Sequence, residues 1–140
     1  MSSEKRVLVV EDVQSTLRGT VMELRLDGII AEWALTIDEA VRKLRERVYD
    51  VMILDWRLPL VAGGPVRPDA GALLLEKVAS GEVGNEAKGV PVVIVTSEGA
   101  AVDRAVLEKY KQCIDLISKL YPDDIRQRVN SILGVETDDV

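Results

Sequence analysis

The run Val51-Met52-Ile53-Leu54, which is followed at once by Asp55, decides the fold class of this chain. The run is apolar throughout and rich in β-branched residues, so it is typical of a strand that is covered on both faces of a parallel sheet. Similar short runs occur at Arg6–Val10, Ile29–Leu35, Pro91–Thr96 and Ile114–Ser118. These runs predict the five strands of one sheet.

The segments between the runs carry apolar residues at helical spacing. Their apolar residues are Leu17, Val21 and Leu24 before Gly28; Ile37, Ala40, Val41, Leu44 and Val48; Leu74 and Val78 before Gly81; Val102, Val106 and Tyr110; and Ile125, Val129 and Ile132 between Pro122 and Gly134. Thr36 with Glu39 three residues later is typical of a capping box. Strands and helices therefore alternate five times, which predicts an α/β fold with helices on both faces of the sheet.

Two connections are longer than the usual 4–6 or so residues. They are residues 57–69 and residues 81–90, and the first contains two adjacent glycines followed by proline. Long connections are often functional, but surface insertions far from any chemistry are also tolerated. The sequence favours neither interpretation.

Composition narrows the function classes. The net charge is −6 and the isoelectric point is about 4.8, so the surface repels nucleic acid and anionic membranes. The single cysteine, Cys113, is interpreted as a small apolar residue, and the absence of histidine excludes histidine-dependent catalysis and histidine metal ligands. We expect a cytoplasmic single domain over residues 1–140, with a core at about residues 5–134 and a short acidic tail at 135–140.

Polar residues follow four of the five predicted strands. Glu11 and Asp12 follow the first, Asp55 follows the third, Thr96 and Ser97 end the fourth, and Ser118 and Lys119 end the fifth. Each alone has a structural explanation, such as a turn or a helix cap. In a parallel sheet, however, the carboxyl ends of all strands meet at one edge. Three carboxylates, a hydroxyl and an ammonium group are therefore expected together.

That set of groups suits phosphoryl chemistry on a carboxylate. Clustered carboxylates are oxygen ligands of the kind that Mg²⁺ prefers. A bound cation relieves the repulsion among Glu11, Asp12 and Asp55 and stabilises an incoming phosphoryl group. Aspartate can be the nucleophile, while Lys119 and Thr96 can bind phosphoryl oxygens.

Four motifs together resemble the receiver domain of response regulators. They are Val7-Leu8-Val9-Val10-Glu11-Asp12, Ile53-Leu54-Asp55-Trp56-Arg57-Leu58-Pro59, Val93-Ile94-Val95-Thr96-Ser97 and Ile117-Ser118-Lys119. The resemblance extends from Val7 to about Leu133. It implies a flavodoxin-like (βα)5 three-layer sandwich with a five-stranded parallel sheet of order 2-1-3-4-5.

The resemblance also implies the roles of individual residues. Asp55 would accept a phosphoryl group from a phosphohistidine on a histidine kinase or histidine phosphotransfer protein. Asp12, Asp55 and the backbone carbonyl of Arg57 would ligate Mg²⁺ or Mn²⁺, with Glu11 acting through a water. Thr96 and Lys119 would contact the phosphoryl group.

A second group of residues flanks this set. Arg57 and Glu98, two positions beyond Asp55 and Thr96, would modulate the phosphate lifetime, as would Ser97. Arg57 and Glu98 could pair and shield the acyl phosphate, although an exposed ion pair of little energetic value is an equal interpretation.

The chain departs from the family at three places besides the long 57–69 connection. Leu120 and Tyr121 separate Lys119 from Pro122, whereas receivers usually have proline directly after the lysine. Leu116 stands where an aromatic residue often moves with the threonine. Ser97 is slightly larger than the usual residue at its position.

Several functions compete with a phosphorylated switch. A pseudo-receiver would keep the fold as a phosphorylation-independent interaction module, and the residues after Lys119 favour it slightly. A haloacid-dehalogenase-like phosphatase would need a second aspartate where Arg57 stands, and a flavin or nucleotide carrier would need a glycine-rich loop in place of the acidic turn. No dedicated substrate turnover is expected beyond the chain's own phosphorylation and dephosphorylation. We expect a monomer or weak homodimer whose kinase and target are unspecified by the sequence.

Overall fold

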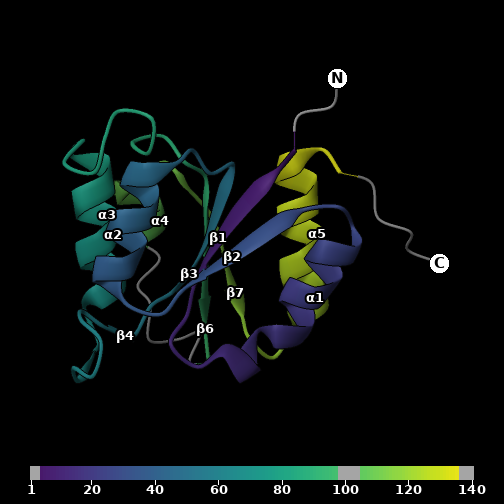
Figure 1. Cartoon of the computed structure of the whole chain (residues 1–140), viewed down its shortest axis with the longest axis horizontal. Coiled ribbons are helices and arrows are strands. Elements are labelled where there is room, and N and C mark those ends of the chain that lie inside the picture. Colours follow the sequence, from purple (N-terminus) through teal and green to yellow (C-terminus); the bar gives the residue numbers. More distant parts are fainter. Residues whose placement is uncertain (1–3, 98–104, 136–140) are drawn as a thin grey trace.

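A five-stranded parallel sheet lies between two layers of helices in the computed structural model, which describes residues 4–97 and 105–135 (Figure 1). The strands are β1 (Arg6–Val10), β2 (Ile30–Ala34), β3 (Val51–Asp55), β6 (Val92–Thr96) and β7 (Cys113–Ser118). Their order across the sheet is β2-β1-β3-β6-β7, and every pair is parallel. This confirms the predicted flavodoxin-like order, in which the first, third and fourth strands of the sheet occupy its centre.

The helices divide between the two faces of the sheet. They are η1 (Gln14–Thr16), α1 (Arg18–Leu26), α2 (Ile37–Glu46), α3 (Ala70–Ala79), α4 (Ala105–Lys109) and α5 (Pro122–Leu133). Helices α1 and α5 lie on one face, and α2, α3 and α4 lie on the other (Figure 1). The predicted three-layer sandwich is therefore confirmed.

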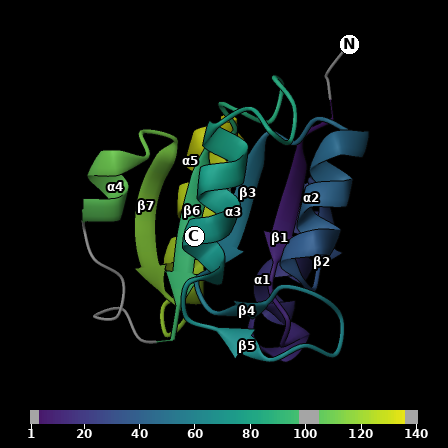
Figure 2. The same cartoon turned by 90° about the vertical axis from the view of Figure 1, so that its left-hand side faces the viewer.

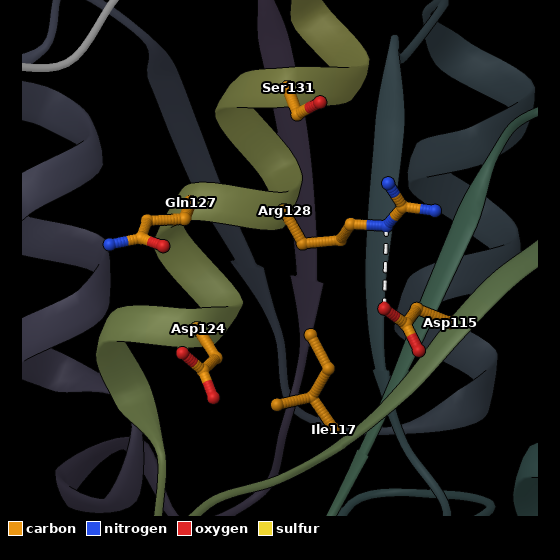
Figure 3. Close-up of a pocket in the computed structure, with 6 residues that line it drawn as sticks. All are labelled: Asp115, Ile117, Asp124, Gln127, Arg128 and Ser131. Atoms are coloured by element: carbon orange, nitrogen blue, oxygen red, sulfur yellow. Dashed lines mark ion pairs between the residues drawn. The ribbon is translucent and has the colours of Figure 1, made fainter.

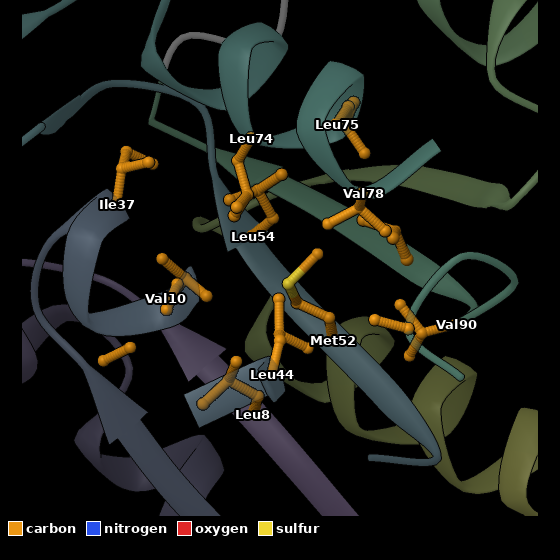
Figure 4. Close-up of a cluster of buried hydrophobic side chains, with 14 of the residues drawn as sticks. Leu8, Val10, Ile37, Leu44, Met52, Leu54, Leu74, Leu75, Val78 and Val90 are labelled. Carbon is orange, nitrogen blue, oxygen red and sulfur yellow. The ribbon is translucent and has the colours of Figure 1, made fainter. Parts of the chain in front are cut away.

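The apolar runs contribute side chains to two hydrophobic clusters, one on each face of the sheet, because successive side chains of a strand point to opposite faces. Leu8, Val10, Met52 and Leu54 belong to the cluster under α2 and α3 (Figure 4). Their neighbours in the sequence belong to the cluster under α1 and α5; they are Val7, Val9, Val51 and Ile53. All residues of β3 and β6 are buried, so the absence of polar alternation in these runs follows from burial on both faces.

The helix ends confirm most of the predicted signals. The Thr36 side chain accepts a hydrogen bond from the Glu39 amide at 3.1 Å, and the Glu39 carboxylate in turn accepts from the amide of Leu35, one residue before the cap. Gly28 and Gly134 follow α1 and α5 with φ of 87° and 70°, a conformation that favours glycine.

One residue of the predicted apolar stripe on α2 is misplaced. Val48 lies beyond the end of the helix, because Arg47 is already extended, with φ of −154° and ψ of 163°. Its side chain is 53% exposed, so it is no part of the core. Val102 of the predicted fourth helix, Glu98 and the acidic tail from residue 136 lie outside the described residues.

The long connection after β3 forms a small hairpin that the sequence did not predict. Its strands are β4 (Leu58–Pro59) and β5 (Val66–Arg67), and they pair antiparallel. Figure 2 shows the hairpin at the end of the sheet toward which the arrowheads of β6 and β7 point. The other long connection, residues 81–90, is packed against the core by Val83, Ala87 and Val90. Neither connection is an unattached loop.

Candidate functional site

A cavity of about 300 Å³ lies at the carboxyl edge of the sheet. Its lining residues are Glu11, Asp12, Val13, Thr16, Asp55, Arg57, Val66, Thr96, Ser97 and Lys119. The structure thus brings together every predicted site residue that lies within its described part. Thr16, Val13 and Val66 are the members that the sequence did not indicate.

Three carboxylates meet in this cavity. One oxygen from each of Glu11, Asp12 and Asp55 lies within 4.8 Å of the others. Strands β1 and β3 create this arrangement, since Val10 is paired with Leu54 and the next residue of each chain segment is acidic. Glu11 is fully buried and Asp55 is 6% exposed, so the cluster is largely removed from solvent.

Lys119 supplies the positive charge. Its Nζ atom lies 2.6 Å from Glu11 Oε1 and 3.2 Å from Asp55 Oδ2. The Lys119 amide donates to the Thr96 carbonyl at 3.0 Å, which extends the pairing of β6 and β7 to this residue. A turn through Leu120 and Tyr121 then leads into α5. The missing proline after Lys119 therefore does not keep the ammonium group out of the cavity.

Burial and a neighbouring carboxylate both disfavour the ionised form of Glu11. Burial raises the pKa of the Glu11 carboxyl well above its usual range, and Asp55 raises it further. Lys119 and the Thr16 hydroxyl, which donates to Glu11 Oε1, act in the opposite direction. Burial would lower the pKa of Lys119, but its hydrogen bond to Glu11 and the charge of Asp55 raise it. The three carboxylates outnumber the single ammonium group, so the protonated form of Glu11 is favoured unless a cation binds.

The donor set fits a hard divalent cation. Glu11 Oε2 is buried and has no hydrogen-bond partner among the described residues, and such an atom is costly unless something binds it. Oxygen ligands at this spacing suit Mg²⁺ or Mn²⁺ rather than a thiolate-preferring metal. The sequence contains no histidine, so a histidine-rich zinc site is excluded.

A second cavity, of about 460 Å³, lies between β7 and α5 (Figure 3). Its lining residues are Asp115, Ile117, Asp124, Gln127, Arg128 and Ser131. Arg128 reaches across the cavity to Asp115, with 3.4 Å between Nε and Oδ2. The two cavities share no lining residue, and the acidic cluster belongs only to the first.

The fold and the acidic edge together define a receiver of two-component signalling. The family model of the response regulator receiver domain matches residues 7–130, and the chain belongs to this family. Receivers take phosphoryl groups from histidine kinases and bind Mg²⁺ in their active site.

Solved structures show the same fold at low sequence identity. The receiver domain of sensor histidine kinase PA1611 from Pseudomonas aeruginosa PAO1, solved with magnesium in its active-site cleft, has a TM-score of 0.74 and 19% identity, with 94% of this chain and 99% of that chain covered. TrrA of Thermotoga maritima, in complex with Mg²⁺ and BeF, has a TM-score of 0.69 and 22% identity, covering 91% and 98%. A CheY-like receiver from Methanospirillum hungatei JF-1 has a TM-score of 0.72 and 25% identity, covering 94% and 95%.

The chain also matches part of a longer curated relative. The chain is 28% identical over 99 residues to the phosphate regulon transcriptional regulatory protein PhoB of Rhizobium meliloti (strain 1021). This match covers 71% of the chain but only 39% of that relative. Across the described ranges, the helices are too short or too polar to cross a membrane.

Proposed function

We propose that this chain is a phosphorylatable receiver in which Asp55 accepts a phosphoryl group from a phosphohistidine partner. The observation that carries the proposal is the convergence of Asp55 with two further carboxylates and the Lys119 ammonium group in one cavity. Asp55 ends the central strand β3, and its Oδ2 atom contacts Lys119.

In this proposal, the acidic side chains also hold a metal ion. Asp12, Asp55 and the Arg57 carbonyl would ligate Mg²⁺ or Mn²⁺, and Glu11 would act through a water. A bound divalent cation would offset the negative charge that develops on the phosphoryl oxygens. The buried, unpartnered Glu11 Oε2 atom supports a ligand at this position.

The transfer itself follows from the residues of the chain. A carboxylate oxygen of Asp55 attacks phosphorus, a P–O bond forms, and the P–N bond to the donor imidazole breaks. The electron pair of that bond stays on the imidazole nitrogen, which takes up a proton. Lys119 and the Thr96 hydroxyl bind phosphoryl oxygens and hold the group in place, so positioning and electrostatics supply the catalysis.

The partners follow from this chemistry. The donor is a histidine kinase or a histidine phosphotransfer protein, and the signal leaves through a protein–protein contact rather than through nucleic acid or a membrane. Arg57, Ser97 and Glu98 would modulate how long the phosphate survives; Arg57 and Ser97 line the cavity. We propose a cytoplasmic protein that is a monomer or weak homodimer.

The test is phosphoryl uptake from phosphoramidate, a small donor whose P–N bond resembles that of phosphohistidine. The intact mass of the parent is compared with those of Asp55→Asn and of a control, Asp123→Asn, which removes an exposed carboxylate at the start of α5. We expect the parent and the control to gain one phosphoryl group in the presence of Mg²⁺ and Asp55→Asn to gain none. Equal uptake by Asp55→Asn would overturn the assignment of the acceptor.

A pseudo-receiver is the second candidate, supported by the residues after Lys119. Leu120 is 78% exposed and Tyr121 is 59% exposed where the family usually has proline. Fluorescence of Trp56, which is buried beside Asp55, reports Mg²⁺ binding in a Trp33→Phe background. Mg²⁺ binding without phosphoryl uptake from any donor would favour the pseudo-receiver.

A further inference from the structure

The β4–β5 hairpin reaches the acidic cavity. Val66 of β5 lines this cavity together with Asp55, Thr96 and Lys119. Val66 lies eleven positions beyond Asp55 in the sequence. The pairing of β5 with β4 brings it back to the cavity. The insertion is therefore part of the site rather than a distant loop.

The position of the hairpin is fixed by contacts to the rest of the fold. Leu58 is fully buried in the core under α2 and α3, and Pro59 is paired with Val66. The Asp38 amide at the start of α2 donates to the Leu60 carbonyl at 3.0 Å. Arg67 forms two hydrogen bonds to Asp69, at 3.0 Å and 2.7 Å. Leu58 and Leu60 thus attach β4 to the rest of the fold, and the pairing with β4 places Val66 at the cavity wall.

Val66 lines the cavity but is partly exposed to solvent. Its side chain is 51% exposed, and it belongs to neither hydrophobic core cluster. A valine side chain has no polar atom, so at the wall of a charged cavity it can cover polar groups but cannot bind them. Valine is favoured in strands such as β5, so its exposure alone assigns it no role; the distinguishing observation is its place in the cavity wall with Asp55, Thr96 and Lys119.

We propose that Val66 shields the phosphoryl group on Asp55 from water and so lengthens its lifetime; this inference rests on the proposed function. In hydrolysis, a water oxygen attacks phosphorus, the P–O bond to Asp55 breaks, and Asp55 leaves as a carboxylate. The water loses a proton to solvent, and inorganic phosphate is released. A branched apolar side chain in the cavity wall excludes water from part of the cavity and lowers the frequency of this attack.

The experiment measures the lifetime of the phosphorylated protein after the donor is removed, by intact mass at timed intervals. Val66→Ala is compared with Val61→Ala, a matched control that makes the same change in the same connection. Val61 is 48% exposed and does not line the cavity. Val66→Ile, which keeps a branched apolar side chain of larger volume, is the second variant.

We expect Val66→Ala to shorten the lifetime by about threefold or more, which corresponds to a small change in barrier, and Val61→Ala to match the parent. Val66→Ile should retain a lifetime at least as long as that of the parent. A Val66→Ala lifetime equal to that of Val61→Ala, or a Val66→Ile lifetime as short as that of Val66→Ala, would overturn the shielding role. A parent that takes up no phosphoryl group overturns the proposed function itself, which is a different result.

Discussion

At the scale of single residues, Lys119 compensates part of the negative charge in the acidic cavity. Its ammonium group contacts both Glu11 and Asp55, which would otherwise face each other as buried like charges. Such a pair is unfavourable unless a cation or a proton compensates it. Lys119 therefore has two tasks that can be separated: it neutralises the unphosphorylated cluster, and in the proposed function it binds a phosphoryl oxygen.

Replacing Lys119 by methionine should separate these tasks. We expect phosphoryl uptake from phosphoramidate to slow by about tenfold or more, because a charged donor to the phosphoryl group is lost. The affinity for Mg²⁺ should be equal to or higher than that of the parent, because the ammonium group of Lys119 no longer competes for the carboxylates. Initial rates by intact mass and titration by tryptophan fluorescence measure the two effects. Lys77→Met, at an exposed pair with Glu82, is the control, and equal rates in both variants would contradict the role of Lys119.

The sequence predicted most of the site because its residues directly follow strands. Glu11, Asp55 and Thr96 are placed by the sheet alone, so strand order was sufficient to bring them together. Val13 and Thr16 were missed because the turn and η1 after β1 bring the chain back beside Glu11, and Val66 was missed because its pairing with β4 brings it to the cavity. A hydroxyl in a polar turn and a valine in a long connection carry no local signal of such a role.

At the scale of elements, a polar contact joins α1 to α5. Asp27, directly after α1, accepts hydrogen bonds from Arg126 Nε and Nη2 at 2.9 Å and 2.8 Å and from Asn130 at 2.9 Å. The Arg126 guanidinium holds the pKa of the Asp27 carboxyl below its ordinary value. The two helices that cover one face of the sheet are thus joined by a charge-assisted contact as well as by apolar packing.

Asp27→Asn should weaken this contact in a pH-dependent way. At pH 7 we expect the free energy of unfolding to fall by about 1–3 kcal/mol, as for other hydrogen bonds to charged groups. A lowered native pKa means that the stabilisation is present above the pKa of the unfolded state, near 3.9 or so, and is lost as pH falls through the native pKa.

Urea unfolding at a series of pH values from pH 7 down to pH 2, which extends well below the ordinary pKa of aspartate, measures that difference. The control is Glu46→Gln, which breaks an exposed pair with Arg42 and should cost about 0.5 kcal/mol or less. A difference between parent and Asp27→Asn that is as large at low pH as at pH 7 would contradict the assignment.

Close packing of α3 against the end of β3 requires glycine at position 71. A Cβ atom on Gly71 would lie 2.5 Å from Trp56 Cε3 and 3.1 Å from Trp56 Cα, so the backbone beside Asp55 would have to move. We expect Gly71→Ala to lower the free energy of unfolding by about 1–3 kcal/mol. Gly19→Ala in α1, where a Cβ atom would meet nothing within 4 Å among the described residues outside its own helix backbone and chain neighbours, should be neutral or stabilising by about 0.5–1 kcal/mol. Denaturant unfolding of both variants measures the contrast, and equal stabilities would contradict it.

The hairpin is the element that the sequence could not predict. Strands β4 and β5 have two residues each, which is too short to show any periodicity. Their pairing spans six intervening residues that include Gly63 and Gly64, and it depends on Leu58 being buried by helices elsewhere in the chain. Local pattern alone indicated a long connection and left its role open.

At the scale of the whole molecule, the apolar runs predicted a parallel sheet covered by helices, whereas the strand order came from the resemblance to receivers and is the order observed. Central strands with no polar alternation and edge strands with partly exposed residues, such as Glu32 of β2, agree with the observed sheet. Val48 was misplaced because helical spacing continues beyond the point where the backbone becomes extended. The apolar pattern thus predicted which faces of the strands and helices are buried, but it predicted the last residue of a helix less accurately.

Metal binding should stabilise the whole fold, since a ligand that binds only the native state raises the free energy of unfolding. At a Mg²⁺ concentration about 100 times the Kd, the gain is about 2.7 kcal/mol. Thermal unfolding with and without Mg²⁺ measures it, and Asp12→Asn should lose most of the shift while Asp123→Asn keeps it. Equal shifts in Asp12→Asn and the parent would contradict a metal site at the acidic edge.

The most direct test of the central claim is to locate the phosphoryl group. The protein is incubated with phosphoramidate with and without Mg²⁺, treated with borohydride to reduce the acyl phosphate to an alcohol, digested and mapped by peptide mass. We predict homoserine at position 55 in the Mg²⁺ sample and unmodified Asp55 in the sample without metal. Reduction at another carboxylate, or at Asp55 to the same extent without Mg²⁺, would contradict the account of a metal-dependent aspartyl acceptor.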